Sequence, residues 1–285
     1  MPQKILVAGA SGHLGQAIVS ELKHQGYAVR ALGRSKTKLS TSGADEVFEA
    51  DLTKEASLPG ACTGIDAVIS CAGAVMDINQ WKEKQTFHQV DYQGNCNLLA
   101  EARRAGVNRV IYVSLAAGEK LRSTAYADAH ERFVEALKAS GLVFTIVRPT
   151  GFFSFLVEVL NFARQGTGLL IGDGSCRTNP IDDTDVARAC VAALTDQLQE
   201  IEIGGPTVFS RREITELAFN VLGKKPRLLS IRPGIFKLLI WPLKLVNRRI
   251  YELMEFGIAV SLMDVVAQPY GKHELKDHFE LKKSG

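Results

Sequence analysis

The stretch KILVAGASGHLGQAIVSELKHQG, residues 4–26, joins a strand pattern to a helix pattern through a glycine-rich turn. Residues 5–8 are apolar and predict a buried strand, and residues 16–25 predict an amphipathic helix. The three glycines between them have the spacing G-x-x-G-x-x-G. The first allows a tight turn, the second lets a pyrophosphate approach backbone N–H groups, and the third lets the helix pack on the strand. The stretch predicts a dinucleotide-binding loop rather than a turn without a ligand, and its candidate contact residues are Gly9, Ser11, Gly12, His13, Leu14 and Gly15.

Apolar runs and helical patterns alternate from this loop to residue 149. The predicted strands are 5–8, 27–32, 46–50, 67–70, 109–114 and 143–147, and the predicted helices are 16–25, 95–104 and 127–140. Such alternation is typical of βαβ units, whose right-handed crossovers place helices on both faces of a parallel sheet. The expected fold class is α/β, a Rossmann doubly wound parallel sheet with a smaller C-terminal region. We expect a dinucleotide-binding domain over 1–150 and a substrate-binding or lid region over 151–285, with some of its segments returning to the sheet.

The composition is that of an ordinary globular protein. Of 285 residues, 46% are hydrophobic and 23% charged, and the net charge of +3 is too small to predict a nucleic-acid partner. The five cysteines are odd in number and form no C-x-x-C pair, which favours free thiols in a reducing compartment over disulfides or a zinc site. Glycines follow the first apolar run too soon for a signal peptide. We therefore expect a cytoplasmic protein without a metal.

The residues after the second predicted strand indicate which nicotinamide cofactor is bound. Arg34 stands there in the sequence GRS, with Lys36 and Lys38 close by and no carboxylate. An NAD enzyme usually has an acidic residue at this position, which holds the ribose 2′-OH. A guanidinium instead matches a 2′-phosphate. The sequence favours NADP(H) over NAD(H), and the alternative is a solvated basic loop.

Two later strand ends add candidate cofactor contacts. The third predicted strand ends at Asp51, where a carboxylate could meet the adenine amino group. The fourth ends in small residues that would let the backbone approach the cofactor. Each observation alone is weak because Asp and Gly are common turn residues. The candidates from these two strand ends are Asp51, Leu52, Cys71, Ala72 and Gly73.

The chain resembles the atypical short-chain dehydrogenase/reductase superfamily, in its NmrA-like, NAD(P)-binding branch. The motifs that carry the resemblance are GASGHLG at 9–15, GRS at 33–35, AD at 50–51, SCAGA at 70–74, RVIYVSLAAG at 109–118, HERFVEALKASGL at 130–142, TIVRPTGFF at 145–153, NPIDDTDVARACVAAL at 179–194 and GGPTVFSRREITELAF at 204–219. The resemblance covers most of the chain to about residue 225. It implies a Rossmann fold and a dinucleotide, and says little about the substrate.

The resemblance also implies catalytic positions. Catalytic members use a serine and a Tyr-x-x-x-Lys pair, in which tyrosine is the general acid and lysine holds the nicotinamide ribose. Ser114 and Tyr126 match, but His130 stands in the lysine position, and imidazole is a weaker partner for a phenolate. His130 could contact the cofactor or serve only as a cap or surface residue. The resemblance further places a segment beside the nicotinamide, whose candidate residues are Pro149, Thr150 and Phe152, whereas Phe153 is expected in the core.

The C-terminal segment 231–268 combines apolar residues with lysines and arginines. A proline interrupts 235–246, which predicts a pair of helices rather than a membrane span. The segment could be a lid over an apolar substrate pocket, an interfacial helix on an anionic membrane, or a surface for a protein partner.

Three functions stay open at this point. The sequence favours an NADP(H)-dependent reductase of a small, fairly apolar carbonyl or enone-like substrate. The alternatives are a non-catalytic NADP(H)-binding redox sensor, which the absent lysine favours, and an assembly or scaffold protein that acts through its C-terminal helices.

Overall fold

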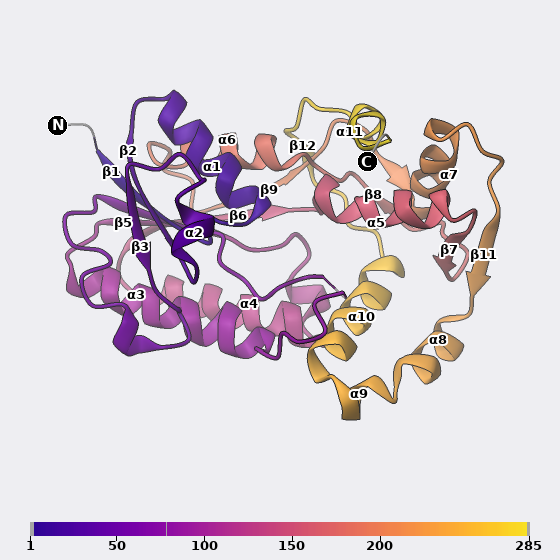
Figure 1. Ribbon diagram of the computed structural model, residues 1–285, viewed down its shortest axis with the longest axis horizontal. Helices are drawn as coiled ribbons and strands as arrows, with labels where there is room; N and C mark the ends of the chain where they lie inside the picture. Colours follow the sequence, from indigo (N-terminus) through magenta and orange to yellow (C-terminus); the bar gives the residue numbers. More distant parts are fainter. Residues whose placement is uncertain (1–2, 78, 284–285) are drawn as a thin grey trace.

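The computed structural model describes residues 3–77 and 79–283. Its centre is an eight-stranded sheet with the order β12-β9-β6-β5-β4-β1-β2-β3, in which every neighbouring pair is parallel (Figure 1). The strands are β1 Lys4–Ala8, β2 Ala28–Gly33, β3 Glu46–Glu49, β4 Ala67–Ser70, β5 Arg109–Val113, β6 Val143–Pro149, β9 Glu200–Gly204 and β12 Gln268–Pro269. The chain runs outward from β1 to β3 and then returns to the other side of β1. This order confirms the expected doubly wound Rossmann fold.

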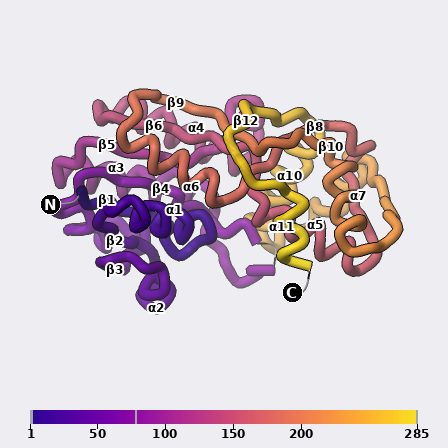
Figure 2. Tube along the Cα trace, turned by 90° about the horizontal axis from the view of Figure 1, so that it is seen from above, coloured from indigo at the N-terminus to yellow at the C-terminus, as the bar shows by residue number. Residues whose placement is uncertain are grey.

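Helices cover both faces of the sheet. Helices α1 (His13–His24) and α6 (Asp183–Ala192) pack together on one face, as Figure 2 shows from above. Helices α3 (Asn95–Arg104) and α4 (Ala125–Lys138) cover the other face. Each face has its own buried cluster, since successive strand residues point to opposite sides.

The chain after β6 builds a distal unit and also returns to the sheet. Helices α5 (Phe153–Arg164), α7 (Arg211–Val221) and α11 (Leu275–Lys282) form a third core, which contains Phe153 as expected. The short pairs are β7 (Gly168–Ile171) with β11 (Leu228–Ile231), and β8 (Arg177–Thr178) with β10 (Phe209–Ser210). Strands β9 and β12 join the central sheet, so residue 150 is no simple boundary, and the division of domains stays a prediction.

Three further helices lie between the distal unit and α4 in Figure 1. They are α8 (Pro233–Ile240), α9 (Leu243–Val246) and α10 (Arg248–Ser261). The predicted break at Pro242 is confirmed. Among the described residues, no helix is both long and apolar enough to cross a membrane.

The features that were not predicted include a one-turn helix and a set of wide turns. Residues Lys36–Leu39 form a one-turn helix, α2, which the Ser35 side chain caps. The turns from His88 to Gly94 before α3 are π-helical. Wider turns of this kind often occur at functional sites, because they displace side chains from the ordinary helical positions.

A buried ion pair holds the ends of β5 and β6 to α4. Arg148 on β6 donates from Nη2 to Oε2 of Glu131 at 2.9 Å, and both side chains are almost fully buried. It also donates to the Leu115 carbonyl at 3.1 Å and pairs with Glu200 on β9. Gly118 leaves room for the pair, since a Cβ there would overlap the Glu131 carboxylate.

We predict that Arg148→Met lowers the free energy of unfolding by about 3 kcal/mol or more, since it leaves the Glu131 charge buried without a partner. Chemical denaturation measures the change. The matched control is Arg132→Met, which breaks an exposed ion pair with Asp128 within α4. It should lower the free energy of unfolding by less than about 1 kcal/mol. Equal losses in the two variants would contradict the prediction.

Candidate functional site

The strand order reverses between β1 and β4, and the candidate residues gather at the carboxyl ends of these strands and their neighbours. Ligands of open parallel sheets bind at such a reversal. Gly9 follows β1 with φ +86°, a conformation that favours glycine. A Cβ there would also come within 2.9 Å of the Cys71 carbonyl oxygen. At Gly15 a Cβ would overlap the Gly9 carbonyl oxygen, so this glycine lets α1 pack against the loop.

The N-terminus of α1 can bind an anion through its backbone N–H groups. Gly12 is its N-cap, no side chain caps the helix, and no acidic residue stands in its first turn. Gly12 and His13 are exposed, and a Cβ at Gly12 would make only an ordinary contact, with its closest neighbour at 3.5 Å. The first backbone N–H groups of a helix need an acceptor, and the helix dipole favours a negative one. The loop therefore has the features that a pyrophosphate site needs. Its contacts with Ser11, Leu14 and the three glycines stay predictions.

Arg34 lies at the end of β2 with its side chain 48% exposed. Its Nη1 donates to Oε2 of Glu83 at 3.0 Å and to Oε1 of Gln85 at 2.7 Å. Burial opposes ionisation of Glu83, but the Gln85 amide and the Arg34 guanidinium lower the pKa of Glu83 below its usual range. The carboxylate that sequence analysis did not find after β2 thus comes from a segment about fifty residues later.

The segment that carries Glu83 and Gln85, residues 75–77 and 79–85, joins two parts of the site; we call it the bridging segment. On one side, Nε2 of Gln85 donates to Oδ2 of Asp51 at 3.4 Å, and Oδ1 of Asp51 accepts from Thr53. On the other side, the buried Arg249 of α10 donates to four carbonyl oxygens of this segment. Sequence analysis missed the segment because it has no apolar periodicity or motif.

The end of β4 is held by two polar residues that sequence analysis also missed. Ser70 donates to Oδ1 of Asn95 at 2.6 Å, and Nδ2 of Asn95 donates to the Ala72 carbonyl at 3.1 Å. Gly73 lies against Asp91, so that a Cβ would come within 2.7 Å of Oδ1. Asp91 belongs to the π-helical turns.

His130 is buried between two side chains. The Tyr112 hydroxyl lies 2.6 Å from Nδ1 of His130, and Nε2 lies 3.2 Å from Oδ1 of Asp91. Burial, followed by the negative charge of Asp91, raises the pKa of Tyr112 well above its usual range. The contact of His130 with a cofactor stays a prediction, and the structure accounts for this residue through Tyr112 and Asp91.

Tyr126 lies in the first turn of α4 with its ring among other rings. The ring centroids of Phe256, His130 and Phe87 lie 4.5, 4.6 and 5.1 Å away. Burial, and then the charge of Asp91, raise the pKa of Tyr126 above its usual range. Tyr126 and His130 are thus brought together by ring contact. Ser114 instead binds Arg148, whose Nη1 lies 3.3 Å from Oγ.

The remaining candidates lie beside the same edge. Cys71 and Ala72 directly follow β4, whereas Leu52 is buried in the core under α3. Pro149 ends β6, and the Thr150 hydroxyl donates to the Asn179 carbonyl. Phe152 is half-buried and packs against Phe155 with 5.5 Å between ring centroids. The cofactor contacts of these residues stay predictions.

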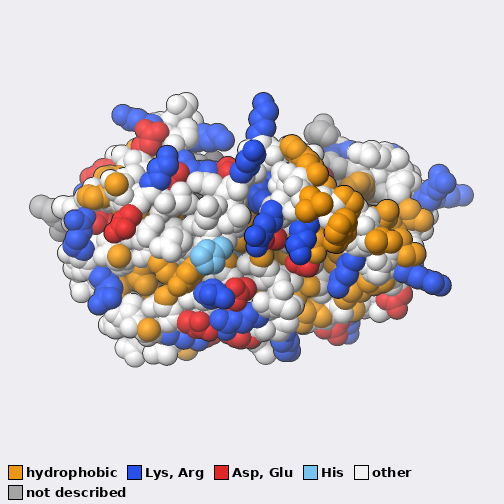
Figure 3. Space-filling model, turned by 90° about the horizontal axis from the view of Figure 1, so that it is seen from below, with side chains coloured by type: hydrophobic (Ala, Val, Ile, Leu, Met, Phe, Trp, Pro, Cys, Tyr) orange, Lys and Arg blue, Asp and Glu red, His pale blue; other side chains and the backbone are white. Residues whose placement is uncertain are grey.

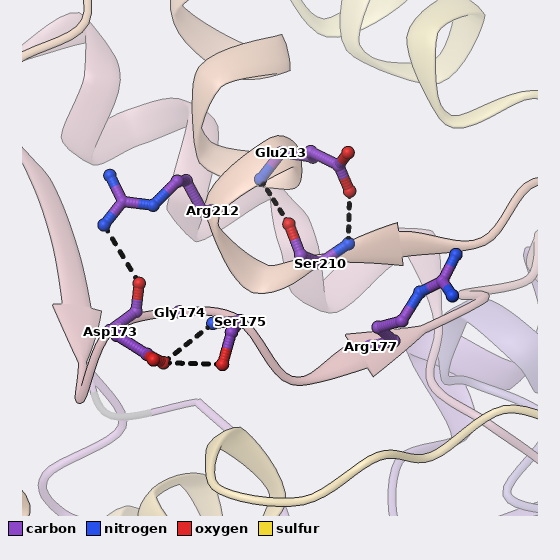
Figure 4. Close-up of a pocket in the computed structure, with 7 residues that line it drawn as sticks. All are labelled: Asp173, Gly174, Ser175, Arg177, Ser210, Arg212 and Glu213. Carbon is purple, nitrogen blue, oxygen red and sulfur yellow. Dashed lines mark hydrogen bonds between the residues drawn. The ribbon is translucent and has the colours of Figure 1, made fainter.

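A surface depression lies elsewhere, beside α7 in the distal unit. It has a volume of about 530 Å³ and is lined by polar side chains (Figure 4). Most of these groups bind one another: Asp173 accepts from Ser175, Arg212 donates to the Asp173 carbonyl, and Ser210 and Glu213 form a capping box. We assign no site to it.

The reversal between β1 and β4 and the uncapped glycine loop define a Rossmann-type dinucleotide-binding protein. The chain belongs to the family described as NAD(P)H-binding, which it matches over residues 9–197. This match agrees with the resemblance to the NAD(P)-binding branch of the atypical short-chain dehydrogenase/reductase group.

The names of similar proteins describe several different activities. The chain is 29% identical to divinyl chlorophyllide a 8-vinyl-reductase, chloroplastic, of Cucumis sativus over 97% of its own length and 75% of the relative's. It is 26% identical to photosystem II assembly factor Ycf39 of Trieres chinensis over 90% and 78%. An NADPH-dependent quinone oxidoreductase of Escherichia coli, solved with NADPH, has a TM-score of 0.78 at 19% identity over 98% and 99%. The last comparison bears on the fold alone.

We predict that two loop glycines respond differently to alanine. Gly12→Ala should change the free energy of unfolding by less than about 1 kcal/mol, because the protein has room for its Cβ, yet weaken NADPH binding at least about tenfold. Gly15→Ala should destabilise the fold by about 2 kcal/mol, because α1 must shift. Calorimetric titration and thermal unfolding measure both effects. Unchanged NADPH binding by the Gly12 variant would exclude a pyrophosphate at this loop.

Proposed function

We propose that the chain is an NADP(H)-dependent reductase that acts on a small, fairly apolar carbonyl or enone-like substrate. The observation that carries the proposal is the uncapped N-terminus of α1 beside Gly9, Gly12 and Gly15, at the reversal of strand order. In this proposal Ser11, His13 and Leu14 complete the pyrophosphate contacts. The family shows NAD(P)H binding, and the reaction and substrate are our inference.

The preference for NADP(H) is assigned to Arg34. Two of its three guanidinium nitrogens make no hydrogen bond or ion pair with the described residues, and its side chain is half exposed. A 2′-phosphate would accept hydrogen bonds from these N–H groups, because the planar guanidinium can bind a phosphate through two parallel hydrogen bonds. Glu83 limits the preference, because its carboxylate competes for the same cation. Asp51, linked to Arg34 through Gln85, is assigned to the adenine side.

Tyr126 is the proposed general acid. The phenol is protonated at neutral pH, as an ordinary tyrosine is, and can donate a proton, although burial and Asp91 raise its pKa and make it a weaker acid. The bound nicotinamide would supply the hydride. Ser114 and His130 are positioning residues in this proposal. Arg148 fixes Ser114. Tyr112 and Asp91 fix His130, whose ring packs against the Tyr126 ring.

The rings around Tyr126 support an apolar substrate. Phe87 and Phe256 adjoin it, and Phe152 lies in the segment after β6. The relative named an 8-vinyl-reductase acts, by its name, on a carbon–carbon double bond, which agrees with an unsaturated substrate class. A non-catalytic NADP(H)-binding protein of sensor or assembly type is the second candidate, which the relative named an assembly factor supports.

We expect Arg34→Ala to lower the affinity for NADPH about tenfold or more and to leave that for NADH nearly unchanged. Glu83→Gln should have the opposite effect and increase the ratio of NADPH to NADH affinity, because it removes the competing carboxylate. Calorimetric titrations with NADPH, NADP⁺, NADH and NAD⁺ measure these ratios. Arg103→Ala, an exposed basic residue near the end of α3, is the control. Equal binding of NADPH and NADH by the unaltered protein would refute the assignment.

We expect Tyr126→Phe to lower turnover of an enone with NADPH at least about 100-fold while NADPH binding is kept, because only the proton donor is lost. Tyr27→Phe is the control. Since the Asp91 charge raises the pKa of Tyr126, Asp91→Asn should lower that pKa and move the alkaline loss of activity to lower pH. A pH–rate profile measures the shift. Binding of NADPH without turnover across a panel of enones and quinones would favour the sensor or assembly function.

A further inference from the structure

Helices α8 and α9 expose an apolar surface next to the candidate site. Leu238 is 74% exposed and Leu245 is 78% exposed, and their neighbours on these helices are also more than half exposed. We define the exposed patch by these residues: Ile235, Leu238, Leu239, Trp241, Leu245 and Val246. Soluble folds rarely leave so many large apolar side chains side by side in water, so the exposed patch indicates a binding surface.

The sequence that carries the exposed patch is strongly basic. Residues 217–251 contain eight lysines and arginines and no aspartate or glutamate, although the whole chain carries a net charge of only +3. Lys237 and Lys244 lie on α8 and α9 themselves, and neither forms an ion pair with a described residue, whereas Arg248 pairs with Glu252. Seen from below in Figure 3, hydrophobic side chains gather in the right half of the molecule, with Lys and Arg groups and fewer Asp and Glu groups around them.

Both tryptophans of the chain belong to this region. Trp241 ends α8, and Trp81 of the bridging segment is 49% exposed. Asn247, just before α10, donates to the Trp81 carbonyl oxygen at 3.0 Å, so the two elements are joined. Tryptophan side chains favour the boundary between lipid headgroups and acyl chains, because one end of indole is apolar and the other carries an N–H donor.

We propose that α8 and α9 dock this protein on the surface of an anionic phospholipid bilayer, with the exposed patch in the headgroup–acyl boundary and the surrounding basic residues on lipid phosphates. Amphipathic helices with Leu and Trp on one side and Lys on the other bind membranes in this way without crossing them. The excess of positive charge over residues 217–251 favours an anionic surface over a second copy of the chain, whose equal charges would face each other. The proposal does not depend on the reductase activity.

The docking surface is connected to the candidate site. Arg249 of α10 lies three residues after α9 and holds the bridging segment. Phe256, also on α10, packs on Tyr126. A protein docked through α8 and α9 would therefore hold this side of the site near the bilayer, where apolar substrates concentrate.

The test is co-sedimentation of the full chain with vesicles of phosphatidylcholine alone or mixed with phosphatidylglycerol. We expect binding to the anionic vesicles that is at least about tenfold tighter than to the neutral ones and that weakens at about 0.5 M salt. Both tryptophans should shift their emission to the blue, and Trp81→Phe isolates the shift of Trp241. No binding to anionic vesicles, or equal binding to both kinds, would overturn the proposal.

Surface variants separate the contributions. The double change Leu238→Ser with Leu245→Ser should lower vesicle binding about tenfold or more, and so should Lys237→Glu with Lys244→Glu. The matched controls are Leu281→Ser, a leucine 83% exposed on α11, and Lys54→Glu, and these should bind as the unaltered chain does. Thermal unfolding and NADPH titration check that each variant is folded. If the leucine change instead dissociates a dimer in solution and vesicles are not bound, the exposed patch is an interface between copies and the proposal fails.

Discussion

The close approach of α1 to the loop after β1 is the constraint on which the rest of the structure depends. The backbone at Gly9 and Gly15 passes so near that no side-chain atom fits between them. This contact leaves the first N–H groups of α1 without a partner at the centre of the sheet edge, because neither a side-chain cap nor an acidic residue is present. The fold thus keeps an electropositive helix end exposed, and an anionic ligand would stabilise it.

Around this helix end, charges that are distant in sequence balance one another. Arg34 forms an ion pair with Glu83, and Arg148 forms ion pairs with Glu131 and Glu200. The first pair is partly exposed and can exchange its carboxylate for another anion, whereas the second is buried and fixes the ends of β5 and β6. Similar ion pairs therefore serve different purposes, and burial decides which one a ligand can replace.

The sequence predicted those features that depend on local pattern. The strands β1 to β6, the glycine loop and the proline break between α8 and α9 all follow from apolar periodicity and from glycine and proline positions. The partners of the candidate residues did not follow. Asp91 with His130, Glu83 with Arg34 and Arg249 with the bridging segment are contacts between residues far apart in the chain, which no local spacing encodes. For His130 the sequence left a cofactor contact or a cap or surface role open, and it did not indicate the buried position between Tyr112 and Asp91.

The Arg249 guanidinium has a consequence for biosynthesis. It holds carbonyl oxygens that precede it by as many as 174 residues, and these belong to the segment that carries Glu83 and Gln85. A chain grows from its N-terminus, so β1 to β6 leave the ribosome well before the residue that fixes this segment. The nucleotide-binding edge is thus completed late, after α10 has emerged. A nascent chain would therefore carry strands β1 to β9 with an unfinished edge until α10 has emerged.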